Sequence, residues 1–426
     1  MRFLLISYFL LLPFQFALSP VPGVDLAVVR VVTLALVLVW LIRGLVMKKL
    51  MLPEGWSAFF LLTFLFLAAL SLLWAENDVF AGRKTVFFVS FLPLFLVLTS
   101  WFREYPEEKN TLAKAFVFGA FLAAVCGIAI FLLQFFLGIE RVFTLLTGQL
   151  LPLFLGTSFG QSVASYPSLL VNISGETLLR ASGFFPDPHM FSAYLGMAAP
   201  IAFGIFLTAP IKKRFWFVLF FIILLADLLT FSRGGYVGLL FGGLLFFFSV
   251  GSAFSWGRKH VVWGLIGAVV LVLLFSLSPL GARLSSSFSK GDGSNIERLR
   301  LWQEAGMHVG ERPLLGVGLG NYPLLVKPTA TYREPIYAHN LYLDIALELG
   351  LVGLALFLTL VGMAIRRAWR SWRQHQQRLP PSVVVSLVVF LTHSFFETPI
   401  FSVHVLPVLL LLLAIGVSYE YRDTIA

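Results

Sequence analysis

Long apolar runs, separated by short stretches of Gly, Pro and charged residues, follow one another along the whole chain. A helix that crosses a membrane needs about 20 apolar residues to span roughly 30 Å of hydrocarbon. The runs predict twelve such helices, starting near residues 3, 25, 57, 84, 113, 188, 215, 234, 261, 339, 382 and 403. Alternating segments of about ten residues, which are typical of a membrane β-barrel, do not recur. The pattern therefore predicts an all-α fold, a polytopic membrane helix bundle.

Two long predicted loops interrupt the spans and divide the chain. The predicted parts are spans one to five at residues 1–137, a first large loop at 138–187, spans six to nine at 188–278, a second large loop at 279–338 and spans ten to twelve at 339–426. The first run, Phe3 to Leu18, is predicted to be a span and not a cleaved signal. No small-residue cleavage site follows it, and Pro20 and Pro22 stand where cleavage would occur.

Composition supports a membrane protein. The 426 residues are 59% hydrophobic and 12% charged, with a mean hydropathy of +0.91, which excludes an ordinary soluble domain with a polar exterior. The single cysteine, Cys126, lies in an apolar run and is interpreted as a small core residue. One cysteine cannot form an intramolecular disulfide, so the compartment cannot be inferred from cysteine usage.

The distribution of positive charge predicts the orientation of the chain. Its net charge of +10 comes mostly from residues in short loops between spans, where Lys and Arg set membrane orientation, so no nucleic-acid partner is expected. With the N-terminus inside, 18 of the 31 Lys and Arg residues fall in cytoplasmic segments. Both large loops and the turn Phe231–Gly235 are then expected on the outer face, where the three segments could form one site.

The second large loop is predicted to contain an amphipathic helix. Ser294 and Glu297 have the spacing of a capping box, which marks a helix start. One face of the helix would hold Ile296, Leu299, Trp302 and Gly306. We expect this helix to lie on the membrane surface or to cap the bundle. The glycine-rich stretch Pro313–Gly320 is interpreted as a tight turn, because no strand precedes it and no Lys-Ser/Thr follows it as in a phosphate-binding loop.

Five segments, in order, resemble the O-antigen ligase family. They are Arg180 to His189, Ser232 to Gly235, Arg298 with Trp302, Pro313 to Gly320, and His339 to Leu343 with Glu348 to Gly353. The motifs cover residues 180 to 355, while residues 1–137 contribute only spans. Within Asp187-Pro188-His189 the family more often has Asn in place of His, which leaves the role of His189 open.

The resemblance implies a membrane glycosyltransferase that works without a nucleotide sugar. We expect no cofactor and no essential metal. Its donor would be a glycan on the lipid carrier undecaprenyl diphosphate. The reaction would occur at the periplasmic face of a bacterial inner membrane, in contact with membrane lipid. The acceptor would be a sugar hydroxyl, on the lipid A core for a ligase of lipopolysaccharide biosynthesis. For a polymerase of the same family it would be the end of another lipid-linked glycan, and for a related branch it would be a protein hydroxyl.

Three arginines within the resembling segments suit a departing diphosphate. Breaking the bond between the anomeric carbon and the diphosphate builds negative charge, which guanidinium groups can stabilise through paired hydrogen bonds. Arg180, Arg233 and Arg298 lie on three separate outer segments and are expected to bind this group. Arginines at span ends also snorkel or bind other anionic lipids, and this alternative stays open, above all for Arg298. Four other outer arginines are interpreted as loop charges: Arg283, Arg300, Arg312 and Arg333.

His339 is the predicted general base, which would take the proton of the acceptor hydroxyl. It is expected in the first turn of a span, where the positive helix terminus and nearby arginines would keep its ring neutral. His189 is the second candidate. The other histidines have no comparable context: His260, His308, His375, His393 and His404.

Two competing functions can be derived from the same residues. A metal-dependent transferase would use Glu76-Asn77-Asp78, although solvated loop charges explain this pair better. A transporter or flippase for lipid-linked glycans would also need outward arginines, but it would favour charged residues midway through its spans. Asp227 and Glu397 are poor candidates for such a relay, because both fall near span ends. The sequence therefore favours the enzyme.

Overall fold

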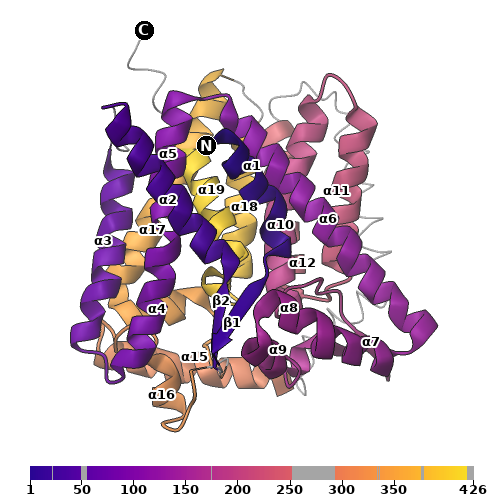
Figure 1. The fold of residues 1–426 in the computed structure, drawn as a ribbon, viewed down its shortest axis with the longest axis vertical. Coiled ribbons are helices and arrows are strands. Elements are labelled where there is room, and N and C mark those ends of the chain that lie inside the picture. The colour runs from indigo at the N-terminus through magenta and orange to yellow at the C-terminus, as the bar shows by residue number, and fades with distance from the viewer. Residues whose placement is uncertain are drawn as a thin grey trace.

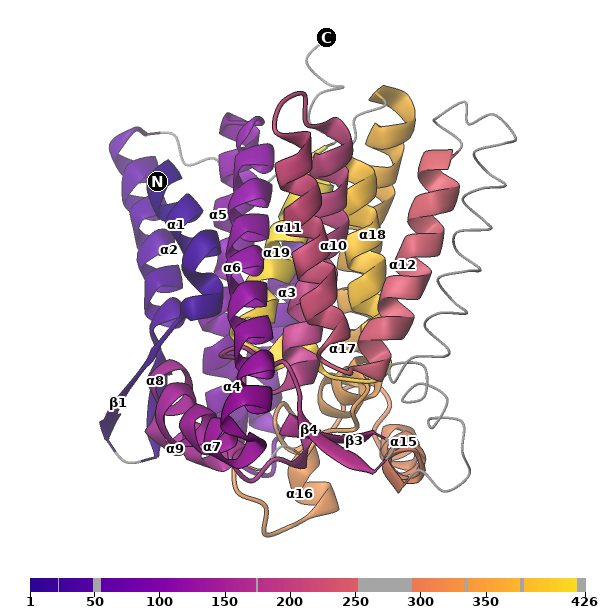
Figure 2. The ribbon, with the colours of Figure 1, turned by 90° about the vertical axis from the view of Figure 1, so that its right-hand side faces the viewer.

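The computed structural model describes residues 1–21, 23–48, 55–173, 175–251, 293–332, 334, 336–375 and 379–419. These residues form a bundle of long helices, and a layer of short helices and two hairpins covers one end of it (Figures 1 and 2). The N-terminus lies at the other end. The bundle is built from α1 (Arg2–Leu11), α2 (Val28–Val46), α3 (Trp56–Leu70), α4 (Asp78–Phe91), α5 (Pro93–Glu104), α6 (Glu108–Leu137), α10 (Pro188–Thr208), α11 (Lys213–Leu228), α12 (Arg233–Gly251), α17 (Leu341–His375), α18 (Leu379–His393) and α19 (Val405–Val417).

The helices confirm an all-α bundle but not the predicted count. In the described part of the chain, six helical stretches are long and apolar enough to cross a membrane, and four further apolar helices are shorter. Eleven of the twelve predicted starts fall within six residues of a helix start, from Arg2 to Val405. The span predicted near residue 261 lies outside the described residues. Twelve spans and the predicted chain divisions stay predictions.

The prediction for the first span was wrong in its extent. The α-helix ends at Leu11 and a short 3-10 helix ends at Phe14, after which strand β1 (Ala17–Val21) pairs antiparallel with β2 (Val24–Ala27). The end of the apolar run is thus a hairpin, and most of β1 is exposed. Apolar content alone cannot separate a half-exposed strand from the end of a buried helix.

The covering layer contains the two predicted loops. The first loop forms α7 (Ile139–Leu145), α8 (Leu151–Leu155), α9 (Thr157–Val163) and the hairpin of β3 (Leu170–Ile173) with β4 (Glu176–Leu179). The second contributes α15 (Gly293–Glu311) and α16 (Tyr322–Val326). The amphipathic helix is thereby confirmed, but its buried face carries Leu301 and Ala305, while Ile296 and Leu299 are exposed.

Helix α19 forms the centre of the bundle. It is apolar on all sides, and every residue from Val405 to Val417 is buried, as expected for a helix without a polar face. It packs against α5, α17 and α18, and both ribbon views place it among the other helices. Helix α10 packs against α6, α11, α12 and α18. The ends of α10, α12 and α18 are thereby held together at the covered end of the bundle.

Helix α17 is broken at Gly350, which has φ 70° and ψ −179°. The segment 313–318 fills the break, which confirms the predicted turn. Three hydrogen bonds join the two segments: Leu351 N to Pro313 O at 2.7 Å, Val317 N to Leu347 O at 2.8 Å, and Gly318 N to Glu348 O at 3.0 Å. A Cβ atom at Gly350 would lie 1.9 Å from the carbonyl oxygen of Leu314. The two glycine-containing motifs thus form one structural joint, which we call the Gly350 joint.

Candidate active site

Six polar side chains from six segments meet at the covered end of the bundle. We call them the Glu397 cluster: Arg180, His189, Ser232, Arg298, His339 and Glu397. They come from the end of the β3–β4 hairpin, the first turn of α10, the turn before α12, helix α15, the segment before α17 and the turn after α18. Two of the predicted diphosphate arginines and the predicted base are therefore neighbours in the fold.

Glu397 is the hub of the cluster. Its carboxylate accepts from Arg298 Nη2 at 2.7 Å and lies 3.1 Å from Nδ1 of His339 and 3.7 Å from Nδ1 of His189. The side chain is only 5% exposed. Burial alone would raise the pKa of Glu397, but the two histidines and the Arg298 guanidinium outweigh it and hold that pKa well below its usual range. The cluster thus contains a buried, ionised carboxylate.

The structure corrects the expected setting of His339. Helix α17 begins at Leu341, and the side chain of Asn340 caps it by accepting from the backbone N–H groups of Tyr342 and Leu343. His339 therefore precedes the helix, in the left-handed region with φ 50°. Burial disfavours its imidazolium, but Glu397 outweighs this effect and raises the pKa of His339 above its ordinary value. The prediction of a ring kept neutral by a helix terminus was wrong.

Neighbouring contacts hold His339 in place and leave it accessible. Asp344 accepts from the backbone N–H of Ala338 at 2.9 Å and also from the hydroxyl of Thr398, so it fixes the residues next to both His339 and Glu397. Trp302 of α15 donates to the carbonyl oxygen of Ala338 at 3.0 Å. The side chain of His339 is nevertheless 37% exposed. A substrate can therefore reach a ring whose orientation is fixed.

Arg180 and His189 form the other side of the cluster. Arg180 is 3% exposed, and its guanidinium donates to the carbonyl oxygens of Thr230 at 2.6 Å and Ser168 at 2.8 Å. Its Nη1 lies 3.3 Å from Nε2 of His189, whose Nδ1 lies 3.0 Å from the Ser232 hydroxyl. His189 therefore connects Arg180 with Glu397, a role that its sequence context did not reveal.

Asp187 opens helix α10. Its side chain accepts from the backbone N–H groups of His189 at 2.5 Å and Met190 at 3.1 Å, as an N-cap does. Burial, followed by repulsion from Glu397, raises the pKa of Asp187 to about 6. The carboxyl group that positions the first turn of α10 thus titrates well above an ordinary aspartate.

Arg233 and Arg298 have different surroundings. Arg233 is the first residue of α12, next to Ser232, and a Cβ atom at Gly234 would lie 3.0 Å from Cβ of Phe396. The start of α12 therefore packs beside the turn that carries Glu397. Arg298 is fixed by its ion pair with Glu397 and does not simply snorkel toward the membrane surface.

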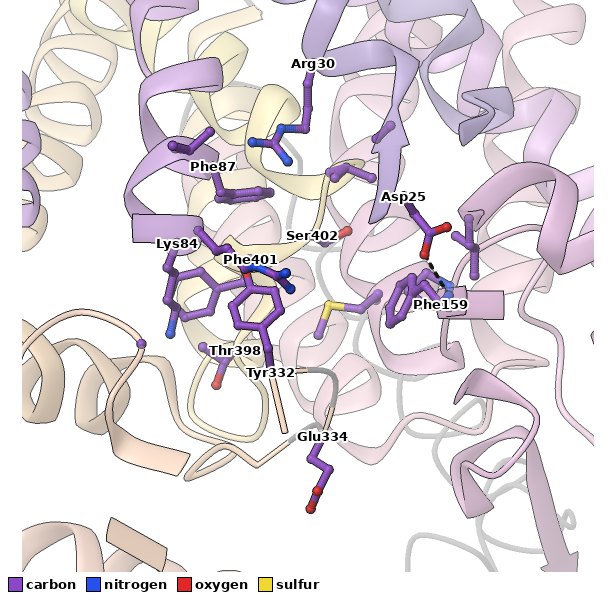
Figure 3. A pocket seen from close by; sticks show the side chains of 18 of the residues that line it. Asp25, Arg30, Lys84, Phe87, Phe159, Tyr332, Glu334, Thr398, Phe401 and Ser402 are labelled. Carbon is purple, nitrogen blue, oxygen red and sulfur yellow. Dashed lines mark hydrogen bonds between the residues drawn. The ribbon is translucent and has the colours of Figure 1, made fainter. Parts of the chain in front are cut away.

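A cavity of about 620 Å³ (Figure 3) is lined by residues that are close in sequence to members of the cluster. Three residues of its wall are near members of the cluster in sequence. Asp187 is two residues from His189, Tyr337 is two residues from His339, and Thr398 follows Glu397 directly. The opposite walls come from the β1–β2 hairpin, α2, α4, α9 and the segment after α16. Its volume lies within the roughly 300–1,000 Å³ that is common for small-ligand sites.

The segment that carries the acidic pair considered for a metal forms the start of helix α4. Asn77 caps α4 by accepting from the backbone N–H of Phe80 at 3.0 Å, and Glu76 and Asp78 beside it are exposed. Across the described ranges, no group of three or more His, Cys, Asp or Glu side chains is arranged to hold a metal ion. A metal-independent reaction stays a prediction.

Comparison with known proteins agrees with these motifs. Residues 217–358 match the O-Antigen ligase family. A "Putative polysaccharide ligase" of Rickettsia bellii is 29% identical over 34% of this chain and 37% of its own length. A protein of the same description from Rickettsia conorii is 29% identical over 40% of this chain and 43% of its own length. The matches thus span less than half of these relatives. With its long apolar helices, this chain is a multi-pass membrane protein, and residues 217–358 of it are similar to the O-antigen ligase family.

Proposed function

We propose that this protein is a membrane glycosyltransferase that moves a glycan from undecaprenyl diphosphate to an acceptor sugar hydroxyl. The acceptor is proposed to be the lipid A core, and the reaction to occur at the periplasmic face of a bacterial inner membrane. The observation that carries this proposal is the Glu397 cluster, in which an accessible histidine, an ionised carboxylate and two arginines meet. The polysaccharide ligase names of the relatives point the same way.

The arginines would stabilise the departing diphosphate. The contacts of Arg180 with two carbonyl oxygens and a histidine orient its guanidinium without removing its charge. Arg233 would add a second cation from the start of α12. Arg298 would be the third, and it must exchange a Glu397 oxygen for a phosphate oxygen when the donor binds. Fixed cations at the point where charge develops lower the barrier, because they need not reorganise during the reaction.

His339 would accept the proton of the acceptor hydroxyl. The hydroxyl oxygen attacks the anomeric carbon, the bond from that carbon to the diphosphate oxygen breaks, and its electron pair leaves with the diphosphate. Nδ1 of His339 faces Glu397, so Nε2 is the nitrogen available to take the proton. Glu397 then stabilises the imidazolium, as a carboxylate partner does for a catalytic histidine. Direct displacement of this kind inverts the anomeric centre.

The alternative functions make different predictions for purified protein. A polymerase of the same family would extend lipid-linked chains with donor alone, whereas a ligase requires lipid A core. A transporter or flippase of lipid-linked glycans would transfer nothing in detergent and would only move the donor across vesicles. The position of the cluster at one end of the bundle favours an enzyme, because a transport relay needs charged groups midway through the spans.

The deciding experiment incubates purified protein with a lipid-diphosphate glycan and lipid A core, and in parallel with donor alone. Glycan on the core supports the ligase, and His339→Gln should lower its formation by about 10²-fold to 10⁴-fold, the usual contribution of a general base. His308→Gln is the matched control, because His308 pairs with the exposed Glu311 on α15, away from the cluster. Transfer at the wild-type rate by His339→Gln would remove His339 as the base.

A further inference from the structure

The cavity beside the Glu397 cluster is lined by cations that the proposed reaction does not use. Arg30 enters it from α2 and Lys84 from α4 (Figure 3). Arg83 of α4 also lines it. All three lie outside residues 217–358, the region that matches the family. The positive charge of this cavity is therefore not explained by the proposed donor chemistry or by the motifs of the family.

The two arginines border one tyrosine. The guanidinium of Arg83 lies over the Tyr332 ring, 4.9 Å from its centroid. Arg30 donates to the Ser90 hydroxyl at 3.1 Å and lies 5.9 Å from the centroid of the Phe87 ring. Neither arginine forms an ion pair within the described ranges. Both keep their positive charge for a ligand.

The other charged groups of the wall already have partners. Lys84 forms a buried ion pair with Glu348 at 2.7 Å. Asp25 accepts from the Ser19 hydroxyl and from the backbone N–H of Phe159, and Glu334 pairs with Lys327 outside the cavity. The wall thus presents two uncompensated guanidinium groups to whatever fills the space.

The wall also suits a sugar ring. Tyr332 and Phe87 lie beside the arginines, and Tyr337 and Phe401 stack at 6.0 Å with an interplanar angle of 20°. Aromatic faces and guanidinium groups together suit a carbohydrate that carries an anion, because the rings contact its apolar face and the guanidinium groups bond its oxygens. Tyr337 is two residues from His339. Through Tyr337, the wall of the cavity is continuous with the segment that carries the proposed base.

We infer that this cavity is the acceptor subsite, and that Arg30 and Arg83 bind a phosphate or carboxylate on the acceptor sugar. The inference rests on the proposed function for the identity of the bound sugar as acceptor. The acceptor is then an anionic glycan, and helices α2 and α4 provide the residues that bind its anionic group. Donor chemistry stays with the Glu397 cluster on the other side of Asp187 and Thr398.

The test is a calorimetric titration of the full protein in phosphatidylcholine nanodiscs. Three probes are used: deacylated phosphorylated core oligosaccharide, the same oligosaccharide after dephosphorylation, and the dephosphorylated form after carboxyl reduction. Wild-type protein should bind the first or second probe at least about tenfold more tightly than the third, since charge-assisted hydrogen bonds carry the contact. Arg30→Gln and Arg83→Gln should erase this preference while binding the third probe unchanged. Arg141→Gln, at an exposed site on α7, should retain it.

Each outcome decides the inference. Equal binding of all probes by wild-type protein, or a preference that survives in both cavity variants, overturns it. Loss of oligosaccharide binding in phosphatidylglycerol nanodiscs would assign the cations to a lipid headgroup and also overturn it. Failure of the proposed function looks different, because probe binding would follow the arginines while no glycan is transferred. Conversely, if transfer proceeds with an unchanged acceptor KM in both variants, the inference alone fails.

Discussion

Replacing Glu397 by Gln tests the centre of the site. The carboxylate binds Arg298 and His339 directly and is 5% exposed. A hydrogen bond to a charged group contributes about 1.5–3 kcal/mol, and the Gln side chain retains an oxygen for only one of the two partners. We therefore expect Glu397→Gln to lower the free energy of unfolding by about 1.5–3 kcal/mol, toward the lower end because His339 is partly exposed.

The pH dependence separates a catalytic effect from a loss of stability. A base must be neutral, so wild-type turnover should rise with pH through the raised pKa of His339. Without the carboxylate that favours imidazolium, this rise should move to lower pH in Glu397→Gln. Maximal turnover should fall about 10²-fold or more, because His339 loses its orienting partner. The assay is glycan transfer to lipid A core between pH 5 and 9.

Stability should follow the same two groups. The raised folded-state pKa of His339 means that its stabilisation is complete below its unfolded pKa of about 6.5 and is lost as pH rises through the folded value. The stabilisation from Glu397 is fully present above its unfolded-state pKa. It is lost only as pH falls through the depressed folded-state pKa. The stability difference between wild type and Glu397→Gln should therefore shrink from pH 6 to pH 9. A turnover profile that does not move, or one that moves equally in the exposed control Glu311→Gln, would refute the reasoning.

Three further predictions concern the surroundings of the site. Arg180→Lys keeps the charge but loses the fork that bonds Thr230 and Ser168, so transfer should fall by about tenfold or more; wild-type kinetics would argue against this clamp. Asp187→Ala should cost about 0.5–2 kcal/mol in thermal unfolding through loss of the α10 cap. The raised pKa of Asp187 should make the wild-type protein lose stability as pH rises from about 4 to about 6. Asp187→Asn should keep the cap and abolish this loss. A variant that still loses stability over this range would contradict the raised pKa of Asp187. Gly350→Ala should cost more than about 1 kcal/mol, because the residue has positive φ and its Cβ would meet the Leu314 carbonyl; Gly362→Ala, in open space on the same helix, is the control that should not destabilise.

The helices could be predicted because their signal is local. An apolar run such as Val405–Val417 needs no distant residue to identify it as a buried helix. The hairpin at Ala17–Ala27 could not be predicted, because its pairing replaces helical hydrogen bonds at the end of an equally apolar run. Local apolarity therefore predicted the helix bundle correctly. It gave a wrong prediction at residues 17–27, where a strand pairing takes the place of helical hydrogen bonds.

The candidate site was predictable only in part, for a related reason. Arg180, Arg298 and His339 stood out because their residue types match the chemistry within recognisable motifs. Glu397 did not, because its role depends on contacts 99 residues away in Arg298 and 58 residues away in His339. The available signal was a single acidic residue in a short apolar turn on the predicted outer face. Its effect also reversed the expected charge preference of His339.

The Gly350 joint also sets the cost of changing the segment between its two halves. By pairing residues 313–318 with 347–352, it closes a loop that carries Tyr332 near its middle and His339 near its end. The entropy lost on closing a flexible loop grows only logarithmically with length, so each doubling costs about 0.6 kcal/mol. His339 is held separately, through the contacts of Ala338 with Trp302 and Asp344. Insertions between residues 327 and 334 can therefore reshape the wall of the cavity at little energetic cost, without moving His339.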